Sequence, residues 1–335
     1  GGLKEDIPYW YMPYLRSVNH FHNPITEQGF SGIWGTGFLS GESSIQWSQK
    51  PLGTQSPGGY YSWFDVRDYF YKALTAADKT TRDTNYAETF RGIGQLMHLV
   101  EDLSVPEHTR DDGHYISYNY EDWVNDTGTD RFPNVGVDPL AGIVRIRNSD
   151  LQNFTIITPV FYDSSALGNP NPLASVPFAN LFDTRQYIGT NPNITLQSNI
   201  GLSEYTNANF LSPDSMFTAE FPYPAWSSVT EYDEVIDLIS GKKKTYLKKL
   251  GYTEGGNGES INHLATGRWF YKYLPSNMKS KGLTFDDRVY SDYAQKLIPR
   301  AVGYSAGLLN YFFRGTLEIT PPAQVAYAVT DGSQT

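Results

Sequence analysis

Three histidines and two well-spaced acids stand close together between His98 and Glu121, and this run constrains the chain more than any other feature. His98 and Asp102 are four residues apart, so on a helix they would lie on one face, one turn apart, where two side chains can hold one cation. Imidazole and carboxylate together suit zinc better than calcium or magnesium, which prefer oxygen ligands alone. The run therefore predicts a metal site built partly on a helix.

The remaining members of this run are His108, His114 and Glu121. Pro106 and Gly113 mark the segment that carries the two histidines as a loop, and Glu121 opens the next helical pattern. A single pair with the spacing of His98 and Asp102 is more often a surface pair or a satisfied core histidine. Three histidines and two acids within 24 residues favour metal binding instead.

The order of these residues resembles the zinc-dependent phospholipase C family, whose fold is shared by the S1/P1 nucleases. A His-x-x-x-Asp pair is followed by Pro-x-His, Gly-His and then Tyr-Glu before an aromatic residue and Val. The segment from His20 to Pro24 is similar to the family's His-Phe-Tyr-Asp-Pro, in which the first His is a zinc ligand. Asp6 precedes His20 by fourteen residues, as the family's Asp ligand precedes its His. The resemblance covers roughly residues 1–125 and returns weakly at 298–313.

The resemblance implies two zinc sites. In the family the last acid follows its His by four residues, whereas His114 and Glu121 are seven apart. Seven residues is two helical turns, so we expect His114 in a loop before a helix that starts near Asn119. Asp111 and Asp112 are alternative acids, ranked below Glu121 because acids in a polar loop are usually solvated. The first site would comprise Asp6, His20, His98 and Asp102, and the second His108, His114 and Glu121.

Family members also carry a third zinc, held by an N-terminal Trp, by a His in the leading helix and by the Asp that here is Asp102. The chain begins at Gly1, too close to Asp6 for that helix. We therefore expect the third site to be completed only by an N-terminal portion or separate N-terminal fragment that this chain lacks. His22 is a weaker stand-in, because a hydrogen-bonded loop histidine is the commoner role.

The net charge of −10 disfavours polymeric nucleic acid as a partner, since phosphate contacts need a basic surface. The one dense basic run, Lys242–Lys244 with Lys248 and Lys249, would on a helix be a solvated face. The absence of cysteine excludes disulfides and thiolate ligands. No apolar run approaches twenty residues, so we expect no transmembrane segment. Abundant Tyr, Asn, Ser, Thr and Gly are typical of an extracellular or cell-surface protein.

The resemblance implies a mainly α-helical, phospholipase C/P1 nuclease-like domain with the metals between helices. Helical periodicity at residues 65–77, 85–103 and 286–313 agrees with this fold, and similar patterns predict helices at 232–250 and 260–274. We expect a metal-binding core at 1–125, a long irregular insertion with short strands (143–146, 154–157) at 126–230, C-terminal helices at 231–315, and a linker or the start of a further β-rich segment at 316–335.

These observations predict a zinc-dependent phosphodiester hydrolase that uses metal-activated water for in-line attack at phosphorus. In the family the equivalent of Asp6 is the proposed general base. Three carboxylates would offset the +4 charge of two zinc ions and leave the centre with a net charge of about +1, which suits an anionic phosphate. Glu121 favours a phospholipase C acting on a lipid head group, because the nuclease branch uses Asp there. The alternatives are an S1/P1-like single-strand nuclease, and a secreted or surface structural protein that keeps the zinc-binding fold without catalysis.

Overall fold

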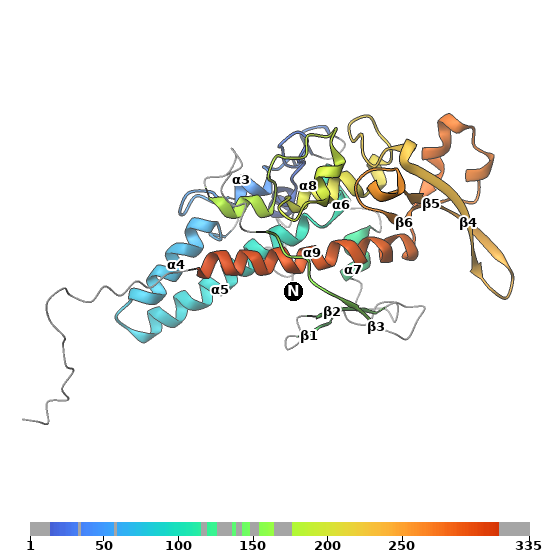
Figure 1. Ribbon diagram of the computed structural model, residues 1–335. Coiled ribbons are helices and arrows are strands. Elements are labelled where there is room, and N and C mark those ends of the chain that lie inside the picture. The colour runs from blue at the N-terminus through green and yellow to red at the C-terminus, as the bar shows by residue number, and fades with distance from the viewer. Residues whose placement is uncertain are drawn as a thin grey trace, which may run out of the picture.

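The computed structural model of the chain describes residues 14–32, 35–56, 59–114, 119–125, 136–138, 143–147, 154–163 and 176–314, and the structural statements below concern these residues. The described chain is mainly helical, with a four-stranded antiparallel sheet at one end and a small three-stranded one (Figure 1). None of the described helices combines the length and apolar character needed to cross a bilayer.

The α-helices are α2 (Tyr14–Ser17), α3 (Ser44–Ser48), α4 (Trp63–Thr75), α5 (Lys79–Asp102), α6 (Pro106–Thr109), α7 (Tyr120–Asn125), α8 (Leu202–Asn209) and α9 (Asp287–Phe313). Short 3-10 turns connect them: η1 (Val18–His20), η4 (Pro177–Leu181), η5 (Pro192–Leu196), η6 (Pro213–Ser215), η7 (Trp226–Ser228), η8 (Tyr252–Glu254), η9 (Tyr271–Tyr273) and η10 (Ser276–Gly282). The strands are β1 (Gly136–Asp138), β2 (Ile143–Arg147), β3 (Phe154–Ile157), β4 (Val229–Asp237), β5 (Lys242–Lys249), β6 (Ile261–Gly267) and β7 (Leu283–Thr284).

Local sequence signals fix where α4 and α5 begin. The Ser62 hydroxyl accepts from the Asp65 amide and the Asp65 carboxylate accepts from the Ser62 amide, so a capping box starts α4. Asp78 caps α5 by accepting from the Thr81 amide, so this helix begins six residues before the expected start. The two helices pack closely because Gly92 lacks a side chain: a Cβ there would lie 2.4 Å from Val66 Cγ2.

The long helix α9 joins two cores. Its C-terminal half packs with α4 and α5 around Val66, Leu96 and Leu308, and its N-terminal half covers the four-stranded sheet around Leu264 and Tyr293. Figure 1 shows α9 running along the molecule, with the α4–α5 hairpin at one end and the sheet at the other. The ligand-bearing end of α5 therefore sits between the two cores.

The helices predicted at 232–250 and 260–274 are wrong, because these residues form β4, β5 and β6 in the order β4-β5-β6-β7. Tyr232 pairs with Tyr246, and Tyr246 with Thr266, in antiparallel register. Gly241, at a φ of 66°, lies in the turn between the first two strands. Cross-strand pairing and burial against α9 outweigh the helical spacing of the lysines, and Lys249 is fully buried rather than solvated.

Other predictions are confirmed. The helices expected at 65–77 and 286–313 are α4 and α9, and strands β2 and β3 occur where short strands were expected. The segment at 126–230, which we expected to be an irregular insertion, also contains α8, which the sequence did not predict. Asp6 and the expected linker at 316–335 lie outside the described residues.

Candidate metal centre

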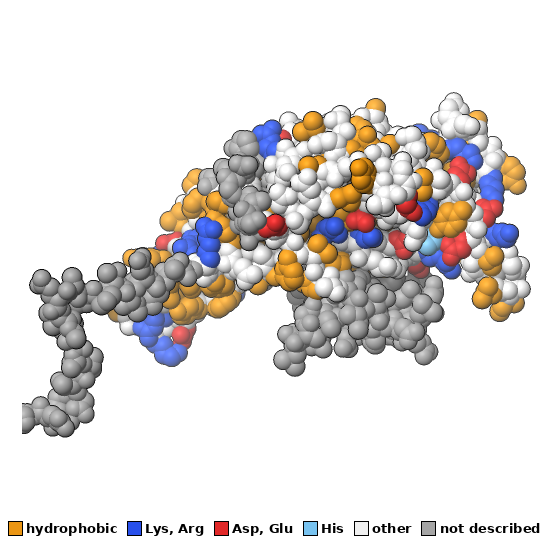
Figure 2. Space-filling view, in the orientation of Figure 1, with side chains coloured by type: hydrophobic (Ala, Val, Ile, Leu, Met, Phe, Trp, Pro, Cys, Tyr) orange, Lys and Arg blue, Asp and Glu red, His pale blue; other side chains and the backbone are white. Residues whose placement is uncertain are grey.

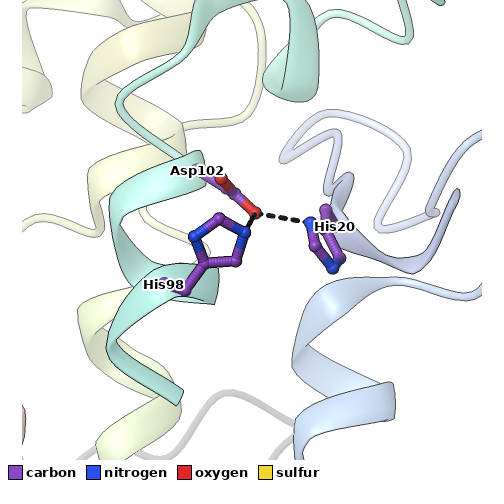
Figure 3. A group of neighbouring side chains, drawn as sticks. All are labelled: His20, His98 and Asp102. Atoms are coloured by element: carbon purple, nitrogen blue, oxygen red, sulfur yellow. Dashed lines mark ion pairs between the residues drawn. The ribbon is translucent and has the colours of Figure 1, made fainter. Parts of the chain in front are cut away.

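The first metal-ligand group forms at the end of α5. His98 and Asp102 lie one turn apart on that helix, with Nε2 of His98 at 3.5 Å from Oδ2 of Asp102. η1 supplies the third member: Nδ1 of His20 is 2.9 Å from the same Asp102 oxygen, and the three side chains point toward one another in Figure 3. His20 and His98 are 78 positions apart in the sequence, and the fold brings them together with Asp102.

The second group is built from α6, the loop after it and α7. Nε2 of His114 is 3.1 Å from Oε2 of Glu121, and Nε2 of His108 is 3.7 Å from the same oxygen. Pro106 starts α6, so His108 occupies a helical turn rather than the predicted loop. His114 lies in the loop before α7 and that helix begins at Tyr120, as expected from the seven-residue spacing.

The two groups are contiguous. Oδ1 of Asp102 is 3.8 Å from Nδ1 of His108, and the rings of His20 and His108 lie 6.5 Å apart between centroids. Within each group the candidate ligand atoms lie within 4.8 Å of one another. Asp102 therefore lies between the two groups and could serve both.

The donor set could hold a metal ion. Nδ1 of His108 is buried and makes no hydrogen bond among the described residues, although a buried nitrogen normally finds a partner. Each group offers imidazole nitrogens and one carboxylate, which are the ligand types zinc prefers. The residues present could hold one metal ion in each group, and Asp6 lies outside the described residues.

The backbone around the ligands is tied together by hydrogen bonds. The amide of His22 donates to the carbonyl of His108 at 3.0 Å, which joins the η1 segment to α6. Oε1 of the buried Glu107 accepts from the Tyr120 amide at 3.2 Å, which joins α6 to α7. The ring of Phe21 packs against the ring of His108, with their centroids 4.5 Å apart, so an apolar side chain lies beside the second group. These contacts thus join the three segments that carry His20, His108 and Glu121.

Arg110 anchors the loop that carries the second group. The guanidinium is fully buried and donates to Ser215 Oγ (2.6 Å), Asn207 O (2.8 Å), Tyr223 O (2.8 Å) and Ser215 O (3.0 Å). The Cζ atom of Arg110 also lies 4.5 Å from the centroid of the Phe221 ring. Burial lowers the pKa of Arg110 to about 10, so the side chain stays charged at neutral pH.

Burial acts differently on the histidines of the second group. It lowers the pKa of His108 well below the ordinary value, so His108 is neutral, the form that can ligate a metal. For His114 burial also opposes charge, but the hydrogen bond to Glu121 and the negative charges of Glu107 and Glu121 together outweigh it and raise the pKa of His114 to about 9. Glu121 is the most exposed of the six ligands found, with a side chain 33% accessible, so the open side of the centre faces α7.

The weaker candidate acids have structural roles. Oδ1 of Asp111 accepts from the Ser31 amide at 2.8 Å, and Oδ2 of Asp112 accepts from the Asp214 amide at 2.9 Å. Each carboxylate therefore connects the ligand loop to another segment. The side chain that meets His114 is Glu121, which the sequence reading ranked first.

The sequence reading missed a third grouping, which consists of His22, Glu27 and Asp183. His22 does not join Asp102 as a stand-in third-site ligand. Its Nε2 lies 2.7 Å from Oδ2 of Asp183 and its Nδ1 lies 2.8 Å from Oγ of Ser43. Asp183 is 161 residues away in the sequence, so no local spacing could have indicated the pair. His22 is a buried, hydrogen-bonded histidine, the role that the sequence favoured.

Comparison of the chain with protein-family models, with curated proteins and with solved structures finds no match.

Proposed function

We propose that this chain is a zinc-dependent phosphodiester hydrolase with a phospholipase C/P1 nuclease-like fold. The observation that carries the proposal is the pair of adjoining ligand groups, three side chains each, with Asp102 between them. Two metals bound side by side suit a phosphodiester, because one can act on the attacking oxygen and the other on the leaving oxygen. An isolated structural site would need only one such group.

Each group would hold one zinc ion through nitrogen and carboxylate ligands. When bound, zinc lowers the pKa of water and neutralises charge on phosphoryl oxygens. The protein's own part is to fix the ligands and to shape the surroundings. His20 and His108 are almost fully buried, whereas the side chains of His98 and Glu121 are 24% and 33% accessible. A phosphate would therefore approach from the side of His98 and Glu121, and Asp6 remains the proposed general base.

We favour a lipid head group over nucleic acid as the substrate. The last ligand of the second group is Glu121, as in the phospholipase C branch, and the chain carries a net charge of −10. An acidic protein lacks the broad basic surface that a polynucleotide needs. An extracellular or cell-surface location remains a prediction that accords with this substrate.

The test compares hydrolysis of p-nitrophenylphosphocholine with hydrolysis of single-stranded DNA by the zinc-loaded chain. Glu121→Gln and His98→Gln remove one ligand from each group and should lower turnover of the phosphocholine ester by more than about 100-fold, since even outer-shell changes at metal sites cost up to that much. Asp111→Asn is the matched control: it changes an acid beside the centre, and Asn suits the positive φ of 53° at that position.

Three results would bear against the proposal. Turnover of DNA alone would replace the lipid substrate by a nucleic acid and favour an S1/P1-like nuclease. Zinc binding without hydrolysis of either substrate would favour the structural-protein alternative, in which zinc only stabilises the fold. Equal loss of activity in Asp111→Asn and Glu121→Gln would show that the second group has no special part in the reaction.

A further inference from the structure

The charge of the chain is unevenly distributed. Residues 229–284, which contain the four-stranded sheet with η8, η9 and η10, carry nine basic and six acidic side chains, a net charge of +3. The rest of the chain carries −13. The sheet end is therefore a basic unit on an acidic protein, and the ligand groups do not account for it.

The tip of the β4–β5 hairpin is apolar and exposed. Leu238 is 92% accessible and Ile239 is 100% accessible, the two most exposed large hydrophobic side chains in the described chain. Lys242 and Lys243 follow after Ser240 and Gly241, and both are exposed. Val235, which pairs with Lys243 across the hairpin, is 37% accessible. Leu238 and Ile239 therefore form a small apolar tip with two exposed lysines nearby.

Two aromatic side chains stand out near the same end of the molecule. Trp269 is 87% accessible and Tyr273 is 85% accessible. The segment that carries them is fixed to β4, because Nζ of Lys272 lies 2.6 Å from Oδ2 of Asp233 and the Tyr271 hydroxyl donates to Glu231. Their exposure is therefore built into the fold. Figures 1 and 2 show the hairpin projecting from this end, with hydrophobic side chains among basic and acidic ones.

We propose that this end, defined by Leu238, Ile239, Lys242, Lys243 and Trp269, is a docking surface for an anionic lipid membrane. Aliphatic side chains on a projecting tip can enter the acyl boundary, lysines beside them can meet anionic head groups, and Trp prefers the interface between the two. The basic charge of this end complements an anionic bilayer. The membrane itself, rather than the phosphodiester in the metal centre, is the partner.

Other occupants fit the surface less well. A second copy of the chain would bring its own lysines against these, and a two-residue tip is far smaller than the roughly 800 Å² per partner that a stable dimer buries. Single-stranded nucleic acid is bound by successive bases that stack on aromatic rings, whereas the tip consists of aliphatic side chains and Trp269 is the one aromatic residue among the five that define the surface. The inference does not rest on the proposed hydrolase activity, because docking needs neither the metals nor a reaction.

The experiment measures co-sedimentation of the full chain with sucrose-loaded vesicles of phosphatidylcholine containing 30% phosphatidylserine, and with vesicles of phosphatidylcholine alone. We expect binding to the anionic vesicles that is about tenfold or more tighter than to the neutral ones. The double variant Leu238→Ser/Ile239→Ser should weaken binding to anionic vesicles by about tenfold or more. Lys242→Gln/Lys243→Gln should remove most of the preference for anionic lipid.

Leu74→Ser is the matched control, because Leu74 is 58% exposed on α4 at the opposite end of the molecule, and it should leave vesicle binding unchanged. Failure of the wild-type chain to sediment with anionic vesicles would overturn the inference. So would equal losses in the tip and Leu74 variants, or a wild-type dimer that the tip variant converts to monomer. Turnover of soluble p-nitrophenylphosphocholine, measured in parallel, should be equal in wild type and tip variant, so failure of docking and failure of hydrolysis are told apart.

Discussion

Replacing Arg110 by methionine should destabilise the chain by about 3–5 kcal/mol, because it leaves buried acceptors without a donor. Four hydrogen bonds from one buried guanidinium reach Ser215, Asn207 and Tyr223. At about 1.5–3 kcal/mol for each bond to a charged donor, they contribute about 6–12 kcal/mol gross. The lowered pKa of Arg110, about 10, corresponds to a charge-burial cost of about 3 kcal/mol. The gross gain therefore exceeds this cost by at least about 3 kcal/mol.

Urea unfolding of wild type, Arg110→Met and Arg110→Lys, each in excess zinc, measures this difference. Lysine offers three donors from a single nitrogen and cannot reproduce the planar fork, so Arg110→Lys should lose about 2 kcal/mol and fall between the other two. Arg110 follows His108 by two residues, so the methionine variant should also bind zinc less tightly in the second group. A methionine variant within about 1 kcal/mol of wild type would refute the reasoning, because the buried acceptors would then not need the guanidinium.

Two further predictions concern packing and pH. Gly303→Ala should destabilise the chain by about 2–3 kcal/mol, because the added Cβ would lie 2.0 Å from a backbone carbonyl oxygen. Gly94→Ala should stabilise α5 by about 0.5–1 kcal/mol, because no atom lies within contact distance of the added Cβ. Thermal unfolding that ranks the two variants in the opposite order would contradict this account of the packing. The pKa of His263 is raised: burial alone would lower it, but the interactions with Asp292 and Glu234, including a hydrogen bond to each, outweigh burial. The protonated histidine therefore stabilises the fold fully below its unfolded pKa, and this contribution is lost as the pH rises through the folded pKa. His263→Gln should therefore cost about 1 kcal/mol at pH 5.5 and less at pH 9, and an equal cost at both values in chemical denaturation would show that the charge has no part.

The sequence predicted the parts of the centre that depend on local spacing. The turn-to-turn separation of His98 and Asp102 requires a helix, and the seven-residue spacing from His114 to Glu121 requires a loop before one; both are present. The joining of His20 to this helix could be expected only from the resemblance, because nothing local connects η1 to α5. Asp183, which meets His22, left no signal in the sequence at all.

The prediction of helices at 232–250 and 260–274 was wrong for a different reason. The lysines from 242 to 249 have helical spacing, but Ser240-Gly241 also supplies a hairpin turn. In β4 the side chains of Tyr232, Glu234 and Ile236 are half-buried, whereas the residues between them are exposed. Both patterns are present, and burial against α9 decides between them. That burial depends on contacts across the chain, which periodicity cannot reveal.

Elemental analysis of the chain, purified without chelator or a metal-affinity tag, tests the central claim most directly. We expect two zinc ions per chain, lost together with phosphodiesterase activity on chelation and restored by zinc. Glu121→Gln should retain fewer than two, and Asp111→Asn should retain both. A chain that folds and purifies with no bound metal, and takes up none when zinc is added, would contradict the assignment of both ligand groups.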